Sequence, residues 1–240
     1  HVIGGYDNKD STSSREEIKE FSYNRNNIEK LTIGLPYKLD ESMNIDSDVL
    51  KCYNSSIKYF KDKGFKVLDL EMQNLKHAVS VYYILTTAEA SSNLSRFDGI
   101  RYGLSLRDNN LDSIYVKTKT AGFGEEVKRR IIIGTYVLSS GYYDAYYSKA
   151  QKVRKMIKTD FDRVFKKVDL LFLPTSPELP YKIGEKKGDP LSMYLSDTFT
   201  VPMNLSGIPA ISIPLGKSKK GLPIGMQFAS NNFQENKLFS

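Results

Sequence analysis

Apolar positions recur at two different spacings in the first third of the chain, and they predict a strand, a helix and a second strand. The run 31–37 is strand-like and stops at a proline. Residues 47–63 follow a helical spacing, with Ser47 as the expected cap and Gly64 at the expected end. Residues 66–70 form the second strand. Short links between the three elements favour parallel pairing of the two strands. The apolar positions of the helix are Val49, Leu50, Tyr53, Ile57 and Phe60.

The remaining pattern continues this alternation. We expect a helix over 76–95, and two helices within 125–165 that are separated at residues 139–141. Residues 168–173 are almost continuously apolar, which is typical of a strand buried on both faces. Two further strands are expected near the end of the chain, at 210–213 and 224–228. Alternating strands and helices predict an α/β fold.

Residues 8–30 differ from the rest because they are polar and nearly free of aliphatic side chains. We interpret them as a connecting segment that contains at most one short exposed helix, followed by a continuous folded portion over 31–240. No apolar run approaches the roughly 20 residues of a membrane span, so we expect no membrane partner. The single cysteine, Cys52, favours a reducing compartment.

The net charge of +7 allows a nucleic-acid partner. The basic residues, however, are scattered along the sequence, and the only short clusters are at 117–119 and 217–220. Blocks of like charge would be the clearer signal for nucleic-acid binding. A non-catalytic basic binding module therefore stays open as an alternative, and scattered solvated lysines are the simpler interpretation.

The sequence contains few candidates for catalytic or metal-binding residues. The chain has two histidines and one cysteine, too few for a zinc site of the usual kind, and it has no phosphate-binding glycine loop. Ser55 and Lys58 match a serine–lysine spacing, but they lie on the polar face of their helix and are expected to be solvated. The serine pairs at 91–92 and 139–140 are interpreted as packing or helix-breaking residues. We therefore predict no catalytic and no metal-binding residue in this chain.

Two charged residues are better candidates for substrate binding. Arg130 follows Arg129 at the start of an apolar helix, and a guanidinium can hold a carboxylate through two parallel hydrogen bonds. Asp197 stands among apolar and aromatic neighbours, where a carboxylate needs a cationic or hydrogen-bonding partner. A purely structural role is the alternative for each of them.

Four blocks of sequence together carry a resemblance to a known family. They read EASSNLSRFDGIRYG at 89–103, GFGEEVKRRIIIGT at 122–135, SSGYYDAYYSKAQKVRK at 139–155, and PLSMYLSDTFTVPMNLSGIPAISIP at 190–214. The last block resembles the C-terminal region of the amidase signature family. The first three are similar to one branch of it, the A subunits of aspartyl/glutamyl-tRNA amidotransferases. The resemblance runs from about residue 3 to the end.

The resemblance implies a mixed, twisted sheet covered by helices, of which residues 1–240 would be an incomplete C-terminal part. It also implies glutamine hydrolysis by a Ser-Ser-Lys arrangement, which supplies ammonia to convert Glu-tRNA(Gln) or Asp-tRNA(Asn) into Gln-tRNA or Asn-tRNA. The implied partners are the B and C subunits of the amidotransferase. ATP and Mg²⁺ would act at the B subunit, with no cofactor bound by this chain. The implied location is the bacterial cytoplasm or an organelle matrix.

The chain departs from the family pattern in one respect. The glycine- and serine-rich nucleophile segment and its upstream lysine do not occur in the sequence, and would precede His1. By resemblance, the glutamine-binding residues are Tyr82, Arg130 and Asp197, with Arg130 for the α-carboxylate and Asp197 for the α-ammonium. Whether Tyr82 or Tyr83 faces the site is open. A fragment of another amidase signature hydrolase, acting on a different amide, is the second alternative.

Overall fold

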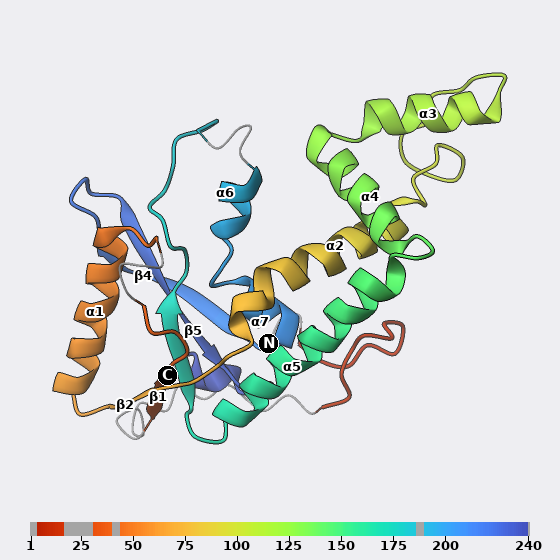
Figure 1. Cartoon of the computed structure of the whole chain (residues 1–240). Coiled ribbons are helices and arrows are strands. Elements are labelled where there is room, and N and C mark those ends of the chain that lie inside the picture. The colour runs from red at the N-terminus through yellow and green to blue at the C-terminus, as the bar shows by residue number, and fades with distance from the viewer. Residues whose placement is uncertain (1–3, 17–30, 40–43, 186–189, 240) are drawn as a thin grey trace. The chain divides into compact units, whose positions relative to one another are not determined.

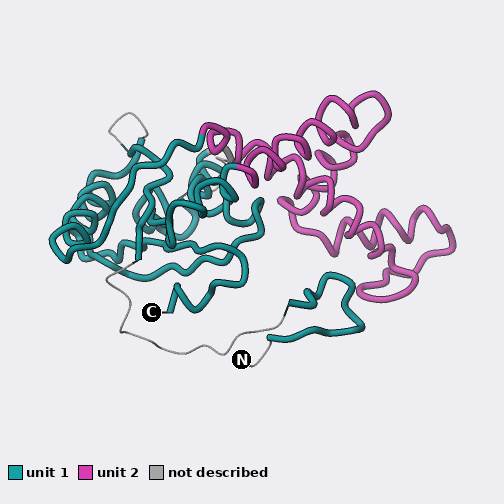
Figure 2. Tube along the Cα trace, turned by 90° about the horizontal axis from the view of Figure 1, so that it is seen from below, with its two compact units in different colours: residues 1–72, 160–240 teal, residues 73–159 magenta. Residues whose placement is uncertain are grey.

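The computed structural model describes residues 4–16, 31–39, 44–185 and 190–239. The chain forms two compact units, one made of residues 1–72 and 160–240 and the other of residues 73–159 (Figure 2). We call them unit 1 and unit 2. Unit 1 contains the sheet, and unit 2 is helical.

Unit 1 is built on a five-stranded mixed sheet with the order β2-β1-β3-β5-β4 (Figure 1). Strand β1 pairs in parallel with both β2 and β3, which confirms the predicted strand–helix–strand unit. Strand β5 runs antiparallel to β3 and to β4. The strands are β1 (Thr32–Leu35), β2 (Lys66–Asp69), β3 (Leu170–Pro174), β4 (Ala210–Lys217) and β5 (Pro223–Ser230). The mixed α/β class predicted from the sequence is confirmed.

Strand β3 lies at the centre of the sheet, and all five of its residues are buried, as its continuous apolar run predicted. On one face, the Phe172 ring stacks on Tyr53 with 5.5 Å between ring centroids and meets Phe60 edge-on at 5.0 Å. Ile33 and Met226 complete this core from the two flanking strands. Aromatic pairs at these separations add to the stabilisation from burial alone.

Helix α1 (Ser47–Asp62) covers this face of the sheet with Val49 and Tyr53 buried. Its cap is Asp46, whose carboxylate accepts a hydrogen bond from the Asp48 amide at 2.8 Å, so the prediction of Ser47 as the cap was wrong by one residue. Gly64 follows the helix with φ +85°, a conformation that suits glycine.

The opposite face of the sheet carries a buried polar residue, Gln227 on β5. Its amide nitrogen donates to the carbonyl oxygens of Pro174, at 3.0 Å, and Phe199, at 2.9 Å. A buried amide or carbonyl group without a hydrogen bond is costly, so this side chain and the two carbonyls satisfy one another. Gln227 therefore fixes the segment between α6 (Pro190–Leu195) and α7 (Val201–Ser206) to the sheet.

Unit 2 consists of helices joined by turns. The predicted helix at 76–95 is present, and the predicted pair within 125–165 is separated at Ser139–Gly141 as expected. A helix at 111–122 was not predicted. The elements are the 3₁₀ turn η3 (Leu75–His77), α2 (Ala78–Leu94), α3 (Leu111–Gly122), α4 (Glu125–Leu138), the π-helix η4 (Tyr143–Ser148) and α5 (Lys149–Val164), whose last residues from Asp160 onward belong to unit 1.

Helices α2 and α4 approach each other closely at Gly134. A Cβ atom at this position would stand 1.9 Å from the carbonyl oxygen of Thr87 and 2.7 Å from the Cβ of Ser91. The Ser91 and Thr135 hydroxyls are 2.9 Å apart and share a hydrogen bond across the same contact. The absence of a side chain at Gly134 therefore sets the distance between the two helices.

Within the described part of the chain, no helix has both the length and the apolar character needed to cross a bilayer. The expected polar connecting segment falls largely on residues outside the described ones, at 17–30, so its predicted short helix stays a prediction.

Gly134→Ala is expected to destabilise the chain by about 2–3 kcal/mol, because a methyl group there must push apart two helix backbones. The measurement is urea unfolding followed by far-UV circular dichroism. Gly124→Ala is the matched control, since no atom lies within 4 Å of its added Cβ. Gly124 is the N-cap of α4, where alanine is less favourable than glycine, so the control should cost about 1 kcal/mol or less. Equal midpoints for the two variants would contradict the close helix contact.

Asp169 joins the start of β3 to β1 and to the C-terminal region. Its carboxylate accepts hydrogen bonds from the Thr32 amide at 2.9 Å and from the Lys237 ammonium at 2.6 Å. Partial burial alone would raise the pKa of this carboxyl group. The hydrogen bonds from Lys237 and Thr32 outweigh it and leave the pKa below its ordinary value.

Asp169→Asn is expected to lower the free energy of unfolding by about 1 kcal/mol at pH 7, since a third of the side chain is exposed. Because the folded-state pKa is lowered, this stabilisation is present above the unfolded pKa of about 3.9 and is lost as the pH falls through the folded value. The difference in urea midpoint between wild type and variant should therefore be smaller at pH 3 than at pH 7. Asp62→Asn, an exposed carboxylate at the end of α1, serves as control. A constant difference at both pH values would refute the assignment.

Candidate functional site

Arg130 lies in the first half of α4, one turn before the close contact at Gly134. Its guanidinium Nε is 3.3 Å from the Glu126 carboxylate, and Arg129 donates to the other oxygen of the same carboxylate at 2.9 Å. Both arginine side chains are 47% exposed. One glutamate thus holds two arginines, which leaves the trio with a net positive charge. Exposed ion pairs of this kind contribute only about 0–1 kcal/mol, so an incoming carboxylate can displace Glu126 at low cost.

Tyr82 lies on α2, the helix that packs against α4. It is half-buried, and its ring meets Tyr83 edge-on with 5.3 Å between centroids. The Tyr82 carbonyl accepts a hydrogen bond from the Thr86 hydroxyl at 2.8 Å, and the Tyr83 carbonyl accepts one from Thr87 at 2.6 Å. Both hydroxyls thus bond to backbone carbonyls of the preceding turn of α2. Both tyrosines are half-buried, so the choice between Tyr82 and Tyr83 stays open.

Asp197 is half-buried in the turn between α6 and α7. Its carbonyl accepts hydrogen bonds from the amides of Thr200, at 3.1 Å, and Val201, at 3.0 Å, which close the first turn of α7. Two residues later, the buried Phe199 ring packs edge-on against Tyr37 at 5.3 Å, and Gln227 binds the Phe199 carbonyl. The backbone that carries Asp197 is therefore anchored to the sheet.

The three predicted residues belong to two different units. Tyr82 and Arg130 lie in unit 2 and come from helices that pack together, whereas Asp197 lies in unit 1.

Burial raises the pKa of the Tyr37 phenol beside Phe199 well above its usual range, so this side chain is neutral at pH 7.

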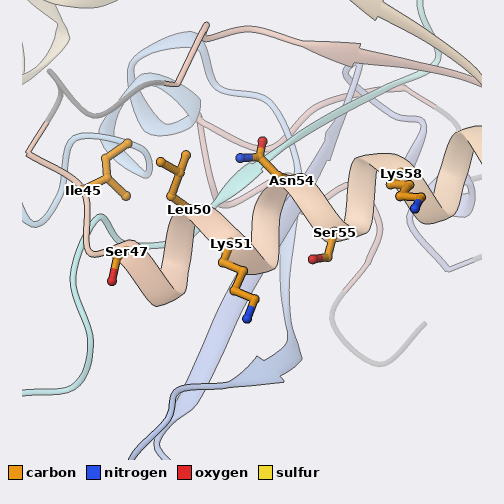
Figure 3. Close-up of a pocket in the computed structure, with 7 residues that line it drawn as sticks. All are labelled: Ile45, Ser47, Leu50, Lys51, Asn54, Ser55 and Lys58. Carbon is orange, nitrogen blue, oxygen red and sulfur yellow. The ribbon is translucent and has the colours of Figure 1, made fainter.

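The serine–lysine candidate of α1 is solvated, as predicted. Ser55 and Lys58 are exposed and point outward from the helix along a shallow, open depression (Figure 3). No hydrogen bond joins them in the described part of the chain. A lysine that does not contact the serine cannot serve as its base. The depression is lined by Ile45, Ser47, Leu50, Lys51, Asn54, Ser55 and Lys58.

The other serine pairs have structural roles. Ser91 packs at the contact of α2 with α4, and Ser139 ends α4, where its hydroxyl donates to the Tyr136 carbonyl at 2.7 Å. Among the described residues, no three His, Cys, Asp or Glu side chains lie close enough together to bind a metal ion.

Sequence reasoning missed two residues that position the candidate site. Glu126 holds Arg129 and Arg130, and its spacing of three and four residues on a helix was a readable signal. Gln227 lies between Met226 and Phe228 in an otherwise apolar strand. A single amide side chain at such a position indicates a buried residue that forms hydrogen bonds.

Comparison with known proteins identifies the family and close relatives. The family model described as Amidase matches residues 1–239. The A subunit of glutamyl-tRNA(Gln) amidotransferase from Pelagibacter ubique is 49% identical over 242 residues, covering 100% of this chain and 49% of the relative. The protein of the same description from Rickettsia bellii is 47% identical, covering 96% of this chain and 48% of the relative.

Among solved structures, the crystal structure of the A subunit of glutamyl-tRNA(Gln) amidotransferase from Thermotoga maritima superposes with a TM-score of 0.72 at 36% identity. The match covers 99% of this chain and 47% of that chain. The chain thus spans about half the length of the relatives and structure that it matches.

Proposed function

The chain belongs to the Amidase family, and we propose that it is the C-terminal part of the glutaminase subunit of a tRNA-dependent amidotransferase. The observation that carries the proposal is the 49% identity, over the whole chain, to a relative described as the A subunit of glutamyl-tRNA(Gln) amidotransferase. Other amidases share the fold, but their sequences are much less similar to this chain. One solved amidase structure, for example, is 19% identical to it. Identity of that level supports the fold and not the substrate.

The proposed reaction begins with attack of a serine hydroxyl on the side-chain amide carbon of glutamine. The C–N bond breaks, ammonia leaves, and a glutamyl ester of the enzyme remains. Water then cleaves the ester, which releases glutamate and restores the serine. The sequence holds no glycine- and serine-rich nucleophile segment, and the relatives are about twice as long. We therefore assign the nucleophile and its lysine to the part of the full-length protein outside this chain.

The role of this chain in the proposal is to hold glutamine by its α-substituents. Free glutamine carries an α-carboxylate and an α-ammonium, so its recognition requires one cation and one anion. Arg130 is assigned to the carboxylate, in exchange for Glu126, and Asp197 to the ammonium. Tyr82 is assigned to the glutamine as well. The net positive charge of the Arg129–Arg130–Glu126 trio favours an incoming anion.

The proposal includes the rest of the complex. The B subunit would use ATP and Mg²⁺ to activate the aminoacyl-tRNA, Glu-tRNA(Gln) or Asp-tRNA(Asn), and would receive the ammonia, and the C subunit would join the other two. No cofactor is assigned to this chain. Such an enzyme works where translation takes place, in the bacterial cytoplasm or an organelle matrix.

The 240-residue chain by itself is expected to release no ammonia from glutamine, because its sequence supplies no activated nucleophile. The measurement is a coupled assay with glutamate dehydrogenase on pure chain, with the natural full-length protein and its partner subunits as positive control. Ammonia release above a buffer blank by the chain alone would disprove the assignment of the nucleophile to another segment.

In the full-length enzyme, Arg130→Lys is expected to raise the KM for glutamine by roughly one to two powers of ten. An ammonium cannot donate the two parallel hydrogen bonds of a guanidinium, and a charge-assisted hydrogen bond is worth about 1.5–3 kcal/mol. Amidation of the tRNA with free ammonia bypasses glutamine, so it should change less than about twofold.

Arg129→Lys is the matched control, because Arg129 has the same exposure and the same glutamate partner. Its KM should stay within about twofold of the wild type. Asp197→Asn should act like Arg130→Lys, since it removes the anion for the α-ammonium. Equal loss of the glutamine and ammonia activities in Arg130→Lys would mean that Arg130 is structural. A larger effect of Arg129→Lys would transfer the carboxylate assignment to Arg129.

A further inference from the structure

The side chain of Gln227 connects the central strand of unit 1 to the turn that carries Asp197. Gln227 is 3% exposed, and its amide nitrogen donates one hydrogen bond to the Pro174 carbonyl and one to the Phe199 carbonyl. A glutamine amide nitrogen carries two hydrogens, so these bonds use both of them. Rotation of the amide by half a turn would place its oxygen against two carbonyl oxygens. The orientation of this buried amide is therefore fixed.

One of the two carbonyls belongs to a strand and the other to a turn. Pro174 ends β3 and is fully buried. Gln227 lies within β5, where its strand partners are Leu173 on one side and Ser212 on the other. Phe199 lies between α6 and α7, outside the sheet. The Gln227 amide thus joins a turn to two strands whose positions the sheet determines.

A single peptide group connects the Gln227 side chain to the backbone of Asp197. The Phe199 carbonyl and the Thr200 amide belong to this group, which is planar and rigid. The carbonyl accepts from Gln227 at 2.9 Å, and the amide donates to the Asp197 carbonyl at 3.1 Å. The Val201 amide donates to the same Asp197 carbonyl at 3.0 Å. The orientation of the Gln227 amide therefore constrains the turn on which Asp197 lies.

Packing alone fixes the location of this turn and leaves the orientation of its peptide groups free. The Phe199 ring is 1% exposed and lies edge-on to Tyr37, and Val201 is equally buried. Apolar burial is non-directional, so a buried ring can stay in place while the peptide group that follows it rotates. A hydrogen bond, in contrast, weakens steeply when its angle is lost. Gln227 supplies the directional part of the constraint.

We propose that Gln227 is a positioning residue for substrate binding, which acts through the peptide group of Phe199 and Thr200 to orient Asp197. This inference rests on the proposed function, in which Asp197 binds the α-ammonium of glutamine. The role of Gln227 is indirect, without contact to the substrate. A carboxylate on a loosened turn binds an ammonium less well, because a charge-assisted hydrogen bond depends on geometry. Loss of Gln227 should therefore weaken glutamine binding and leave the chemical step almost unchanged.

The test is a double-mutant cycle of Gln227→Met and Asp197→Asn in the assembled full-length enzyme, with the KM for glutamine hydrolysis as the readout. Methionine is similar in length to glutamine and removes both hydrogen bonds. Gln227→Met alone should raise the KM about tenfold and leave kcat within about threefold. In the Asp197→Asn background it should raise the KM by no more than about twofold, because the residue through which it acts is already lost.

Ser212→Ala is the matched control within the sheet. Ser212 is the strand partner of Gln227 on β4, and its hydroxyl shares a hydrogen bond with the Thr175 hydroxyl at 2.6 Å. The control removes a hydrogen bond beside Gln227 that does not involve the Phe199 carbonyl, so the KM should stay within about twofold of wild type. Amidation of the tRNA with free ammonia reports on folding and assembly, and Gln227→Met should leave it within about twofold.

Amide hydrogen exchange tests the same connection without any substrate. In the full-length protein, peptides that cover 197–204 should exchange about tenfold faster in Gln227→Met than in wild type, measured by mass spectrometry. The physical reason is that the acceptor of the Thr200 and Val201 amides, the Asp197 carbonyl, is no longer held in one orientation. Ser212→Ala should leave this exchange unchanged.

The proposal is overturned if Gln227→Met leaves the KM unchanged, or raises it by the same factor in both backgrounds, because Gln227 would then act independently of Asp197. An equal loss of ammonia-dependent amidation overturns it as well, since Gln227 would then support the fold in general. Unchanged exchange over 197–204 would show that Gln227 does not hold the turn. If the wild type hydrolyses no glutamine, the proposed function fails, whereas faster exchange in the variant would still assign Gln227 to the Asp197 turn.

Discussion

Burial of β3 on both faces is the constraint on which unit 1 depends. A strand with five buried residues must lie inside the sheet, so β1 and β5 have to flank it. Phe172 then organises the core beneath α1, while the other face needs a covering segment of its own. Gln227 supplies the link, because its two hydrogen bonds satisfy carbonyls of β3 and of the segment before α7. Asp197 belongs to the segment that Gln227 holds against the sheet, so its position within unit 1 depends on the burial of β3.

In unit 2 the corresponding constraint is the missing side chain of Gly134. The close approach of α4 to the backbone of α2 fixes the height and rotation of α4, and Arg130 lies one turn away from this contact. The ion pair with Glu126 orients the Arg130 guanidinium in the absence of the proposed ligand. A side chain that is already oriented loses less conformational entropy on binding. The same glutamate keeps two neighbouring arginines from repelling each other.

The sequence was informative where a local pattern decides the structure. The continuous apolar run of β3 and the helical spacing of α1 each predicted their element, and Gly64 marked the helix end. Local patterns could not predict contacts between distant residues, such as Lys237 with Asp169 or the approach of Gly134 to Thr87. The helix α3 was missed because its threonine- and lysine-rich turns have a weak apolar periodicity. The site residues came from family resemblance, since neither Arg130 nor Asp197 differs by itself from a structural charge.

In the proposed glutamine site, opposite charges would explain how a fold shared with other amidases selects one amide. Related amidases have this fold at about 19% identity, so the scaffold alone does not select glutamine. A neutral amide would leave the proposed Asp197 carboxylate and the Arg130 guanidinium without their ligands, and a site built to bind charged groups rejects analogues that lack them. Glu126 lowers the cost of an unpaired Arg130, because it can pair with Arg130 when no ligand carboxylate is present. In this proposal, discrimination against amides without an α-ammonium falls on Asp197, whose backbone is anchored to the sheet through Phe199 and Gln227.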